Sequence, residues 1–301
     1  MKSESLARPS DAETVHRLPR VLVGIVTHNR AGILPKAIQS ALSQSYPNID
    51  VAVLDDGSAD GTSALQTDFP MVQWHRWESP HGYLEARNLL MRTERVDYYL
   101  SLDDDAWFVD TDEITAAIEY LETNPKVAAV AFDILSPDRP TPAVRSVPRP
   151  TSMFIGCGHV VRIAALREAG FYTPSPGYYG SEEKDLCLRF LDRGWDVHLL
   201  PGVHVWHDKT VVARNQTVQH RSGVCNDLAF ALRRCPFPMM LIVLPAKMLS
   251  HLRFAVGNGL LRPCVAGFGL FFGHAWAVWN SRSPVRTKTF EDFLRRSREA
   301  S

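Results

Sequence analysis

Apolar and polar segments alternate through the first two thirds of the chain. Val21–Thr27 (VLVGIVT) is a continuous apolar run, typical of a strand buried on both faces of a sheet. Similar runs predict strands over Asp50–Leu54, Met71–Trp77, Tyr98–Leu102, Val127–Phe132, Ser152–Val161 and Trp195–Leu200. Helical spacing predicts helices over Ile33–Leu42, Gly57–Leu65, Leu84–Met91, Asp112–Leu121 and Glu182–Leu191. This alternation predicts an α/β domain with a parallel sheet and helices on both faces.

The pattern changes twice along the chain. Ser136–Pro150 contains five prolines and is predicted to be a loop. After about Cys235 the sequence becomes apolar, basic and helical in character. We therefore expect a flexible tail over residues 1–19, an α/β domain over 20–234 and a helical C-terminal region over 235–301.

The most apolar stretches lie in that last region. Pro236–Ala246 contains three prolines, and Cys264–Trp279 is interrupted by His274. Both fall short of the roughly 20 residues of a spanning helix. Two interpretations stay open: buried core helices, or a basic surface rich in aromatic side chains that lies at a membrane interface.

Charge divides the chain in the same place. The 301 residues carry 33 Lys and Arg against 33 Asp and Glu, a formal net charge of zero. Residues 233–301 alone hold 11 basic and 3 acidic residues, a net of +8, so residues 1–232 carry −8. The overall balance argues against a wholly basic nucleic-acid binder, and the division indicates two parts with different roles.

Cysteine usage and the N-terminus indicate the compartment. The five cysteines are scattered and form no C-x-x-C pair, which argues against a disulfide framework or a zinc ribbon. The N-terminal segment is polar and lacks the apolar core of a signal peptide. Both features predict a cytoplasmic protein.

Polar residues follow three of the predicted strands directly. They are Thr27-His-Asn-Arg30, Asp55-Asp-Gly-Ser58 and Asp103-Asp-Asp105. Ligands of open α/β sheets bind beyond the carboxyl ends of strands, and clustered carboxylates need a cation to offset their repulsion. The edge is therefore predicted to hold a divalent metal with a diphosphate. A capped turn, a solvated acidic loop and a surface arginine are the simpler alternatives.

Two familiar phosphate-binding patterns are missing from the sequence. The first predicted strand is followed neither by G-x-G-x-x-G nor by the G-K-[ST] of a phosphate loop. Nicotinamide-cofactor and P-loop chemistry are therefore poorly supported.

A second acidic group opens a predicted helix in Gly180-Ser-Glu-Glu-Lys-Asp-Leu186. Acids in a first helical turn, with Ser181 as the cap, complement the helix dipole and need no further role. The same position would hold a carboxylate ionised, as a general base must be. The preceding Tyr172, Tyr178 and Tyr179 either stack on a sugar or fill the core.

Two histidines end the α/β pattern, in His204-Val-Trp-His207. Neither belongs to a helical zinc motif. Each could be a core or hydrogen-bonded histidine, or one could bind the metal already predicted at the sheet edge.

Taken in order, these motifs resemble the family 2 glycosyltransferases, which have the nucleotide-diphospho-sugar fold called GT-A. The matching pieces are Val23–Arg30, Val53–Ser58 with Asp60–Thr62, Gly82 with Ala86–Asn88, Leu102–Asp105, and Gly180–Leu186 with Arg189 and Gly194. They cover roughly residues 21–208. The resemblance implies a mostly parallel sheet flanked by helices, and it makes residues 20–234 the catalytic domain.

The resemblance also implies a site for the nucleotide-sugar. Asp103 and Asp105 would be the ends of the D-x-D motif, and they would bind Mn²⁺ or Mg²⁺ together with His207. The donor-binding residues would be Thr27, Arg30, Asp55, Asp56, Arg87, Asp103 and Asp104. Within this set, Asp56 would meet the base and Arg87 the diphosphate.

The implied reaction is inverting transfer of the sugar to an acceptor hydroxyl. Glu183 falls where many relatives carry the aspartate of a Glu-Asp pair, the catalytic base. The pair here is Glu182-Glu183, so either residue could be the base. Asp185 would support the acceptor site.

The partners that follow are a nucleoside-diphosphate-sugar donor and a glycan or lipid-linked acceptor, in bacterial surface polysaccharide or glycolipid synthesis. The basic C-terminal region predicts peripheral binding to anionic membrane at its inner face, and core packing or dimerisation is the rival account. Two other functions are weighed: a sugar-phosphate nucleotidyltransferase, whose glycine-rich loop is missing, and a non-catalytic binding protein, which the intact acids disfavour.

Overall fold

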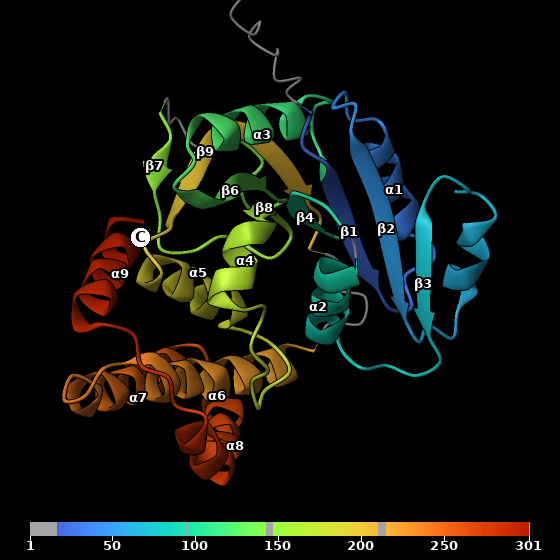
Figure 1. Ribbon diagram of the computed structural model, residues 1–301. Coiled ribbons are helices and arrows are strands. Elements are labelled where there is room, and N and C mark those ends of the chain that lie inside the picture. Colours follow the sequence, from blue (N-terminus) through green and yellow to red (C-terminus); the bar gives the residue numbers. More distant parts are fainter. Residues whose placement is uncertain (1–16, 94, 143–146, 210–214, 301) are drawn as a thin grey trace, which may run out of the picture.

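The structure is a computed structural model, and it describes residues 17–93, 95–142, 147–209 and 215–300 (Figure 1). Most of the predicted tail, residues 1–16, therefore lies outside the described residues, as do 143–146 of the proline-rich loop. The described chain folds into an α/β domain with a layer of helices against one side.

One mixed sheet forms the centre of the domain. Its strands are β1 (Val21–Thr27), β2 (Ile49–Asp56), β3 (Gln73–Trp77), β4 (Tyr98–Asp103), β5 (Ala106–Phe108), β6 (Val127–Leu135), β7 (Arg149–Pro150), β8 (Gly158–Arg162) and β9 (Asp196–His207). Their order is β3-β2-β1-β4-β8-β6-β9-β5, with β7 paired to β9. The expected parallel pairing holds for β3-β2-β1-β4 and for β6-β9, whereas β8, β5 and β7 run antiparallel to their neighbours.

Helices connect the strands, and after β9 the regular elements of the described chain are all helices. They are α1 (Leu34–Leu42), the 3₁₀ helix η1 (Gly61–Gln66), α2 (Tyr83–Thr93), α3 (Glu113–Thr123), α4 (Ile163–Ala169), α5 (Glu182–Asp192), α6 (Gln216–Arg234), α7 (Met240–Gly257), α8 (Leu261–Asn280) and α9 (Thr287–Ala300).

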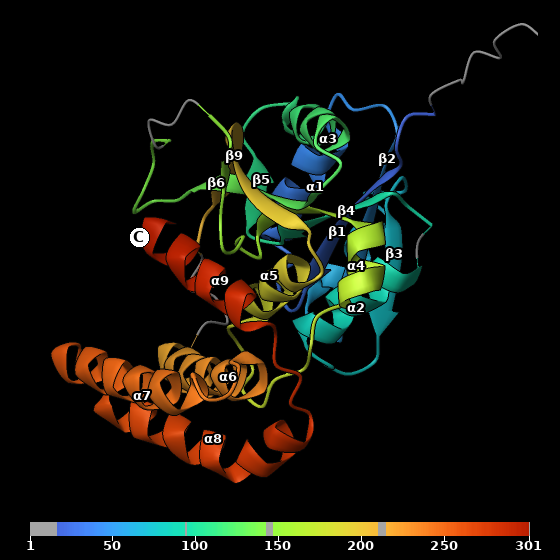
Figure 2. The same ribbon diagram turned by 60° about the vertical axis from the view of Figure 1, so that its left-hand side comes forward.

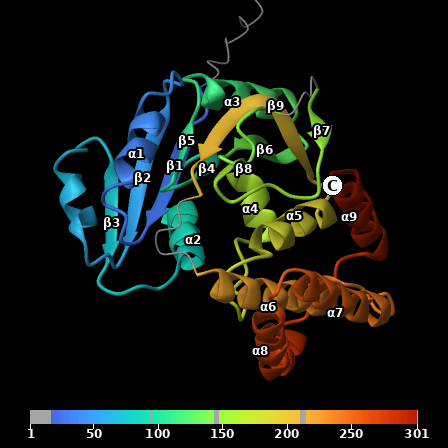
Figure 3. The ribbon, with the colours of Figure 1, turned by 180° about the vertical axis from the view of Figure 1, so that it is seen from behind.

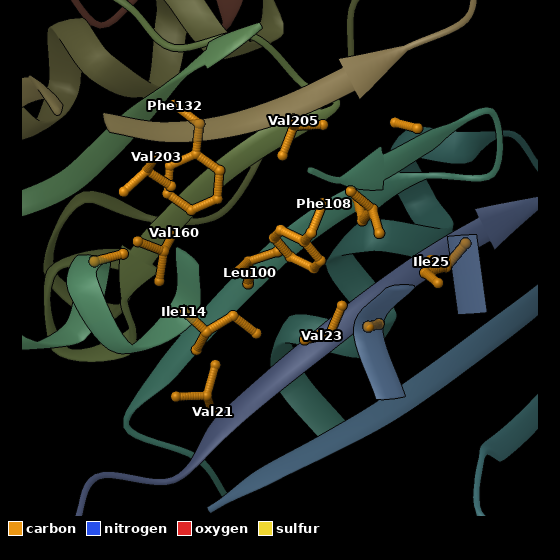
Figure 4. Close-up of a cluster of buried hydrophobic side chains, with 14 of the residues drawn as sticks. Val21, Val23, Ile25, Leu100, Phe108, Ile114, Phe132, Val160, Val203 and Val205 are labelled. Carbon is orange, nitrogen blue, oxygen red and sulfur yellow. The ribbon is translucent and has the colours of Figure 1, made fainter. Parts of the chain in front are cut away.

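The sheet buries a different set of side chains on each face. On one face, Val21, Val23 and Ile25 of β1 pack with residues of α1 and α3, and Figure 4 shows Ile114 of α3 among them. On the other face, alternate strand residues such as Leu22 pack against α2, α4 and α5. The continuous apolar run of β1 is thus explained, because both faces of this strand are covered.

A fourth layer consists of the C-terminal helices. Helices α6, α7 and α8 lie together below α2 and α5, and α9 returns beside α5 (Figures 1, 2 and 3). Their core joins Leu188 and Leu191 of α5 to Phe230, Phe271 and Phe290. Helix α6 belongs to this core although it precedes residue 235. The helical layer therefore begins earlier in the chain than the predicted boundary, and the division at 234/235 stays a prediction.

Much of the layer's outer surface is apolar. Of the 21 large hydrophobic residues exposed in the described chain, 12 lie between Phe237 and Trp279. Helix α7 has the length and the composition that would allow it to cross a membrane, and only 11% of it is buried. This helix is longer than its apolar run at 236–246, because Lys247, His251 and Arg253 interrupt the hydrophobic pattern without ending the helix.

Local differences from the predicted elements have simple causes. The predicted helix at Gly57–Leu65 is a short 3₁₀ helix that begins at Gly61, because Gly57 adopts a left-handed φ of +69° in a turn. Ser181 occupies the N-cap position of α5, but its side chain forms no capping hydrogen bond, so that part of the prediction is wrong. The strand expected from Ser152 starts at Gly158. The strand expected from Trp195 continues from Asp196 to His207.

Candidate active site

Parallel pairing brings the three predicted polar segments to one edge of the sheet. Strand β1 lies between β2 and β4, with Thr27 opposite Asp55 and Val26 opposite Asp103. The residues that follow these strands must therefore meet at the carboxyl ends, as the sequence predicted.

Arg30 holds the acidic run after β4. Its Nη1 lies 2.9 Å from Asp104 Oδ1 and 3.0 Å from Asp105 Oδ2, and all three side chains are largely buried. Burial raises the pKa of Asp104 to about 7, although the guanidinium group of Arg30 acts in the opposite direction. Arg30 is thus a built part of the acidic edge rather than a free surface charge.

His207 reaches the same edge from the other half of the sheet. It ends β9, where it pairs with Ala106 of β5, directly after the acidic run. Its Nε2 lies 3.2 Å from Asp105 Oδ1, and its Nδ1 lies 3.5 Å from Cys157 Sγ. One ligand atom each from Asp103, Cys157 and His207 lies within 4.8 Å of the others. His207 therefore lies close to both predicted carboxylate ligands, Asp103 and Asp105.

The chemistry of this donor set fits a hard divalent cation. Burial raises the pKa of the Cys157 thiol well above its usual range. The carboxylates of Asp103 and Asp105 supply the hard oxygen ligands that Mn²⁺ or Mg²⁺ prefers, and the imidazole of His207 is an acceptable ligand for Mn²⁺. The three consecutive carboxyl groups contact two guanidinium groups, those of Arg30 and Arg87, and the imidazole of His207, so a further positive charge would be favourable.

Arg87 of α2 connects the acidic edge to α5. Its Nη2 donates to Asp103 Oδ1, and its Nη1 lies 3.7 Å from Glu183 Oε1. Burial by itself lowers the pKa of Arg87, but the carboxylates of Asp103 and Glu183 raise it well above its ordinary value. A Cβ atom on Gly156 would lie 2.5 Å from Glu183 Oε1 and 3.0 Å from Arg87 Nη1. Glycine at this position therefore makes room for the pair.

The two adjacent glutamates at the start of α5 have different surroundings. Tyr83 donates its hydroxyl hydrogen to Glu182 Oε1, and Glu182 is buried. Glu183 keeps 18% of its side chain exposed beside Arg87. Burial and the neighbouring Glu182 raise the pKa of Glu183 to about 8, against the attraction of Arg87. Glu183 is thus the better placed of the two to exchange a proton near neutral pH.

Asp55 and Asp56, predicted to meet the nucleotide, shape the loops around the edge. Asp55 Oδ1 accepts a hydrogen bond of 2.9 Å from the Ser58 backbone N–H. The two carboxylate oxygens of Asp56 accept the backbone N–H groups of His81 at 2.6 Å and Gly82 at 2.9 Å. Both aspartates are buried, and their roles toward a nucleotide stay predictions.

Asp185 is not brought together with the other predicted catalytic residues. Its carboxylate pairs with Arg189 Nε at 2.9 Å and with Arg234 Nε at 2.6 Å, and it is only 4% exposed. Burial raises its pKa, but the two arginines outweigh this and hold it below its ordinary value. In this structure Asp185 joins α5 to α6, and its predicted role toward an acceptor stays a prediction.

His204 likewise lies apart from the acidic edge. Its nearest possible ligand partners are Asp110 and Glu113, at the start of α3. Tyr172 is buried in the core, whereas Tyr178 and Tyr179 lie around the ring of Tyr83, at 6.0 and 5.4 Å between centroids. The core alternative is confirmed for Tyr172, and stacking of Tyr178 and Tyr179 on a sugar stays a prediction.

Three residues of the site were not singled out from the sequence. Tyr83 fixes Glu182, Cys157 lies against His207, and Gly156 lets Glu183 approach Arg87. Gly156 and Cys157 come from the segment directly before β8. A single tyrosine, glycine or cysteine carries no motif, so only spatial proximity could reveal them.

Comparison with known proteins gives a consistent family assignment. Residues 22–163 match the family described as glycosyl transferase family 2. The chain is 25% identical over 179 residues to the Escherichia coli protein WfaP, described as a UDP-Glc:α-D-GlcNAc-diphosphoundecaprenol β-1,3-glucosyltransferase, covering 58% of this chain and 71% of WfaP. It is 30% identical over 130 residues to the succinoglycan biosynthesis protein ExoO of Rhizobium meliloti, covering 41% of this chain. The chain spans only about a third of ExoO, since the match covers 36% of that protein.

Solved structures share the fold at low sequence identity. A mannosyltransferase from Pyrobaculum calidifontis, solved with GDP-Man and Mn²⁺, aligns over 87% of this chain and 76% of its own with a TM-score of 0.60 and 18% identity. Residues 1–349 of S. aureus TarS align over 94% and 92% with a TM-score of 0.61 and 12% identity. The expected GT-A fold with a C-terminal helical region is thereby confirmed.

Proposed function

Because the chain is a member of glycosyl transferase family 2 through residues 22–163, we propose that it transfers a sugar from a nucleoside-diphosphate-sugar to an acceptor hydroxyl with inversion. The observation that carries this proposal is the series of buried and partly buried charged side chains that runs from His207 and Asp105 through Asp103 and Arg87 to Glu183. It joins a site suited to a metal–diphosphate with a carboxylate suited to proton removal.

In the proposed reaction, Glu183 accepts the proton of the acceptor hydroxyl as its oxygen attacks the anomeric carbon. The bond to the diphosphate oxygen breaks, and its electron pair leaves with the nucleoside diphosphate. Tyr83 holds Glu182 away from this role, so that Glu183 is the base. Arg87 keeps Glu183 and Asp103 at a fixed separation and orients both.

Asp103, Asp105 and His207 would hold the divalent cation, Mn²⁺ or Mg²⁺. A cation bound there supplies positive charge beside the diphosphate and so improves the leaving group. Arg30 would keep the acidic run in place, and the D-x-D function falls to Asp103 and Asp105, with Asp104 turned to Arg30.

The acceptor and the location form the second part of the proposal. WfaP is described as acting on a diphosphoundecaprenol-linked sugar, which supports a lipid-linked acceptor in envelope polysaccharide synthesis for this chain as well. A lipid-linked acceptor requires the enzyme to work at a membrane surface, and we assign that contact to the inner face of the cell membrane.

The outer faces of α7 and α8 support such a contact. Ile242, Phe254 and Trp276 expose 74%, 55% and 75% of their surface. The exposed Arg253 and Arg262 lie among these apolar residues, and no acidic residue occurs in α7 or α8. Apolar side chains flanked by cations suit the interface of an anionic bilayer. A second copy of the chain on this surface would appear as a dimer in solution without lipid.

A panel of nucleotide-sugars tests the reaction directly. The purified chain with Mn²⁺ is expected to release a nucleoside diphosphate from one of them, and EDTA is expected to stop the release. Pyrophosphate as the product would instead indicate a nucleotidyltransferase. No metal-dependent turnover or binding of any donor would contradict the proposal and favour a non-catalytic protein.

A further inference from the structure

A cavity of about 750 Å³ lies where the α/β domain meets the helical layer. Helix α2, residues 172–178, and the helices α6 and α8 contribute to its wall. Asp103, Asp105 and Glu183 do not line it, so it is separate from the catalytic cluster. Tyr83 lies on the boundary between the two, because its ring lines the cavity and its hydroxyl bonds Glu182.

The wall of this cavity is preformed. Asn226 of α6 is 2% exposed, donates to the carbonyls of Gly177 and Tyr179, and accepts the Gly177 N–H at 2.7 Å. A Cβ atom on Gly177 would lie 2.8 Å from Asn226 Oδ1, so only glycine allows this approach. Asn88 and Tyr172 exchange two further hydrogen bonds of 3.0 Å. The helical layer thus fixes the loop beside the catalytic glutamates.

The charge of the wall favours an anion. Arg92 of α2 and Arg221 of α6 both line the cavity, against one acidic residue, Glu85. Within the described parts of the chain, neither arginine forms an ion pair with a carboxylate. Arg92 instead lies 4.6 Å above the ring of Phe171. Two arginines without acidic partners on one cavity wall are a suitable site for a phosphate group.

The cavity also has an apolar part to its lining. Leu270 of α8 and Leu89 of α2 contribute to its wall. Beyond Leu270, the same helix exposes Phe272 and Trp276, which belong to the surface assigned above to the membrane. An apolar chain bound in the cavity would therefore contact the helix that carries this surface.

From these observations we infer that the cavity binds the lipid-phosphate part of the acceptor. The phosphate would contact Arg92 and Arg221, the aliphatic chain would pass Leu270 toward α8, and the sugar would lie at Tyr83, beside Glu183. This inference rests on the proposed function and deepens it, since it names an amphiphilic phosphate ester as the class of acceptor.

Binding of farnesyl phosphate to the full chain tests the inference without any turnover. We expect it to bind at least about tenfold tighter than ethyl phosphate or farnesol, because only the whole amphiphile contacts both the arginines and the leucines of the wall. Arg221→Glu and Arg92→Glu are each expected to weaken it by about tenfold or more, because each loses a charge-assisted contact. Isothermal calorimetry below the micelle concentration measures the dissociation constants.

Matched variants separate the cavity from the membrane surface. Arg253→Glu changes an exposed arginine on α7 outside the cavity, and it is expected to leave farnesyl phosphate binding unchanged. Leu270→Asn is expected to weaken farnesyl phosphate but not ethyl phosphate. Equal binding by the wild type and the Arg92→Glu/Arg221→Glu double variant would overturn the inference. Equal affinity for ethyl and farnesyl phosphate would also overturn it and leave a free-phosphate site.

The proposed function and this inference can fail separately. If the proposed function is right, Glu183→Gln loses about 10²-fold or more in kcat, yet it is expected to bind farnesyl phosphate as the wild type does. Farnesyl phosphate binding without any donor turnover would contradict the function and keep the site. Donor turnover by a chain that fails to bind farnesyl phosphate would support the proposed function and overturn this inference.

Discussion

The sheet edge is acidic and the helical layer is basic, and the two regions differ in whether their charged side chains are buried or exposed. At the sheet edge the acids are buried: Asp105 is 1% exposed and contacts Arg30 and His207. In the helical layer Arg253 and Arg262 lie at the surface, and apolar side chains as large as Trp276 lie there with them. One region buries polar groups and the other exposes apolar ones.

Neither region is fully stabilised by water alone. The difference between them indicates which kind of ligand would stabilise each one. Buried carboxylates in excess of cations repel one another until a further positive charge arrives. Exposed apolar side chains gain free energy when another surface removes them from water. The first region is therefore built for a small charged ligand, and the second for an extended apolar surface.

The largest expected effect comes from the metal ligands of the sheet edge. Asp105→Asn should lower the rate of nucleoside diphosphate release by about 10³-fold, because charge stabilisation of the leaving group is usually the largest catalytic contribution. Asp138→Asn, which changes an exposed acid paired with Lys209, should have no such effect. An unchanged rate in Asp105→Asn at saturating Mn²⁺ would remove this residue from the site.

The base at the start of α5 gives the next largest effect. Glu183→Gln should lower kcat by about 10²-fold or more, the range of general acid–base catalysis. Glu182→Gln should lower it less, because Tyr83 already holds that carboxylate. A larger loss in Glu182→Gln than in Glu183→Gln would reverse the two roles.

The pH dependence of the reaction rate tests the assignment of Glu183 as the base. Burial, together with Glu182 and Asp103, raises the pKa of Glu183 to about 8, and Arg87 opposes this. A general base works in its ionised form, so the wild-type rate should rise as pH increases from 6 through about 8 and then level off. The residual rate of Glu183→Gln should lack this rise. A flat wild-type profile would argue against proton removal by Glu183.

Asp227 of α6 is expected to contribute to stability, because it joins α5 of the α/β domain to α7 of the helical layer. This side chain pairs with Lys184 of α5 and with Lys247 and His251 of α7. Asp227→Asn should lower the free energy of unfolding by about 2 kcal/mol, since it leaves two partly buried lysines without their partner. Asp68→Asn, an exposed acid, is the control, and chemical unfolding measures both.

The pH dependence of that stability has a defined sign. Burial raises the pKa of Asp227, but His251, Lys184 and Lys247 outweigh this and hold it well below its ordinary value. A carboxyl group with a depressed folded-state pKa stabilises the protein above its unfolded pKa of about 4, and this stabilisation is lost as pH falls. The wild type should therefore lose more stability below pH 4 than Asp227→Asn does. Equal losses would mean that the pair contributes nothing.

The smallest expected effect concerns a single side chain of the apolar surface. Trp276→Glu should weaken cosedimentation with anionic liposomes by about tenfold, because one inserted aromatic side chain contributes about 1.5–3 kcal/mol. Met71→Glu is the matched control, since Met71 is 81% exposed but lies in the α/β domain. If both variants bind liposomes like the wild type, the helical layer is not the membrane contact.

The parts of the fold that could be predicted are those with strong local periodicity. The strands β1, β2 and β4 and helix α2 lie close to their predicted ranges, because a doubly buried strand is apolar throughout and an amphipathic helix repeats every turn. β5, only three residues long, and the helix α4 carry too little pattern to be recognised. The antiparallel direction of β8 follows from its connections and leaves no trace in its composition.

For the site, the sequence by itself determined the candidates, because motifs in a fixed order limit which residues can reach the carboxyl ends of the strands. The structure decided their partners. Glu182 and Glu183 are adjacent and chemically alike, yet Tyr83 binds one and Arg87 approaches the other. Asp185, two residues further, is drawn to Arg234 of another helix. Such pairings depend on distances between residues far apart in the chain, which packing alone sets.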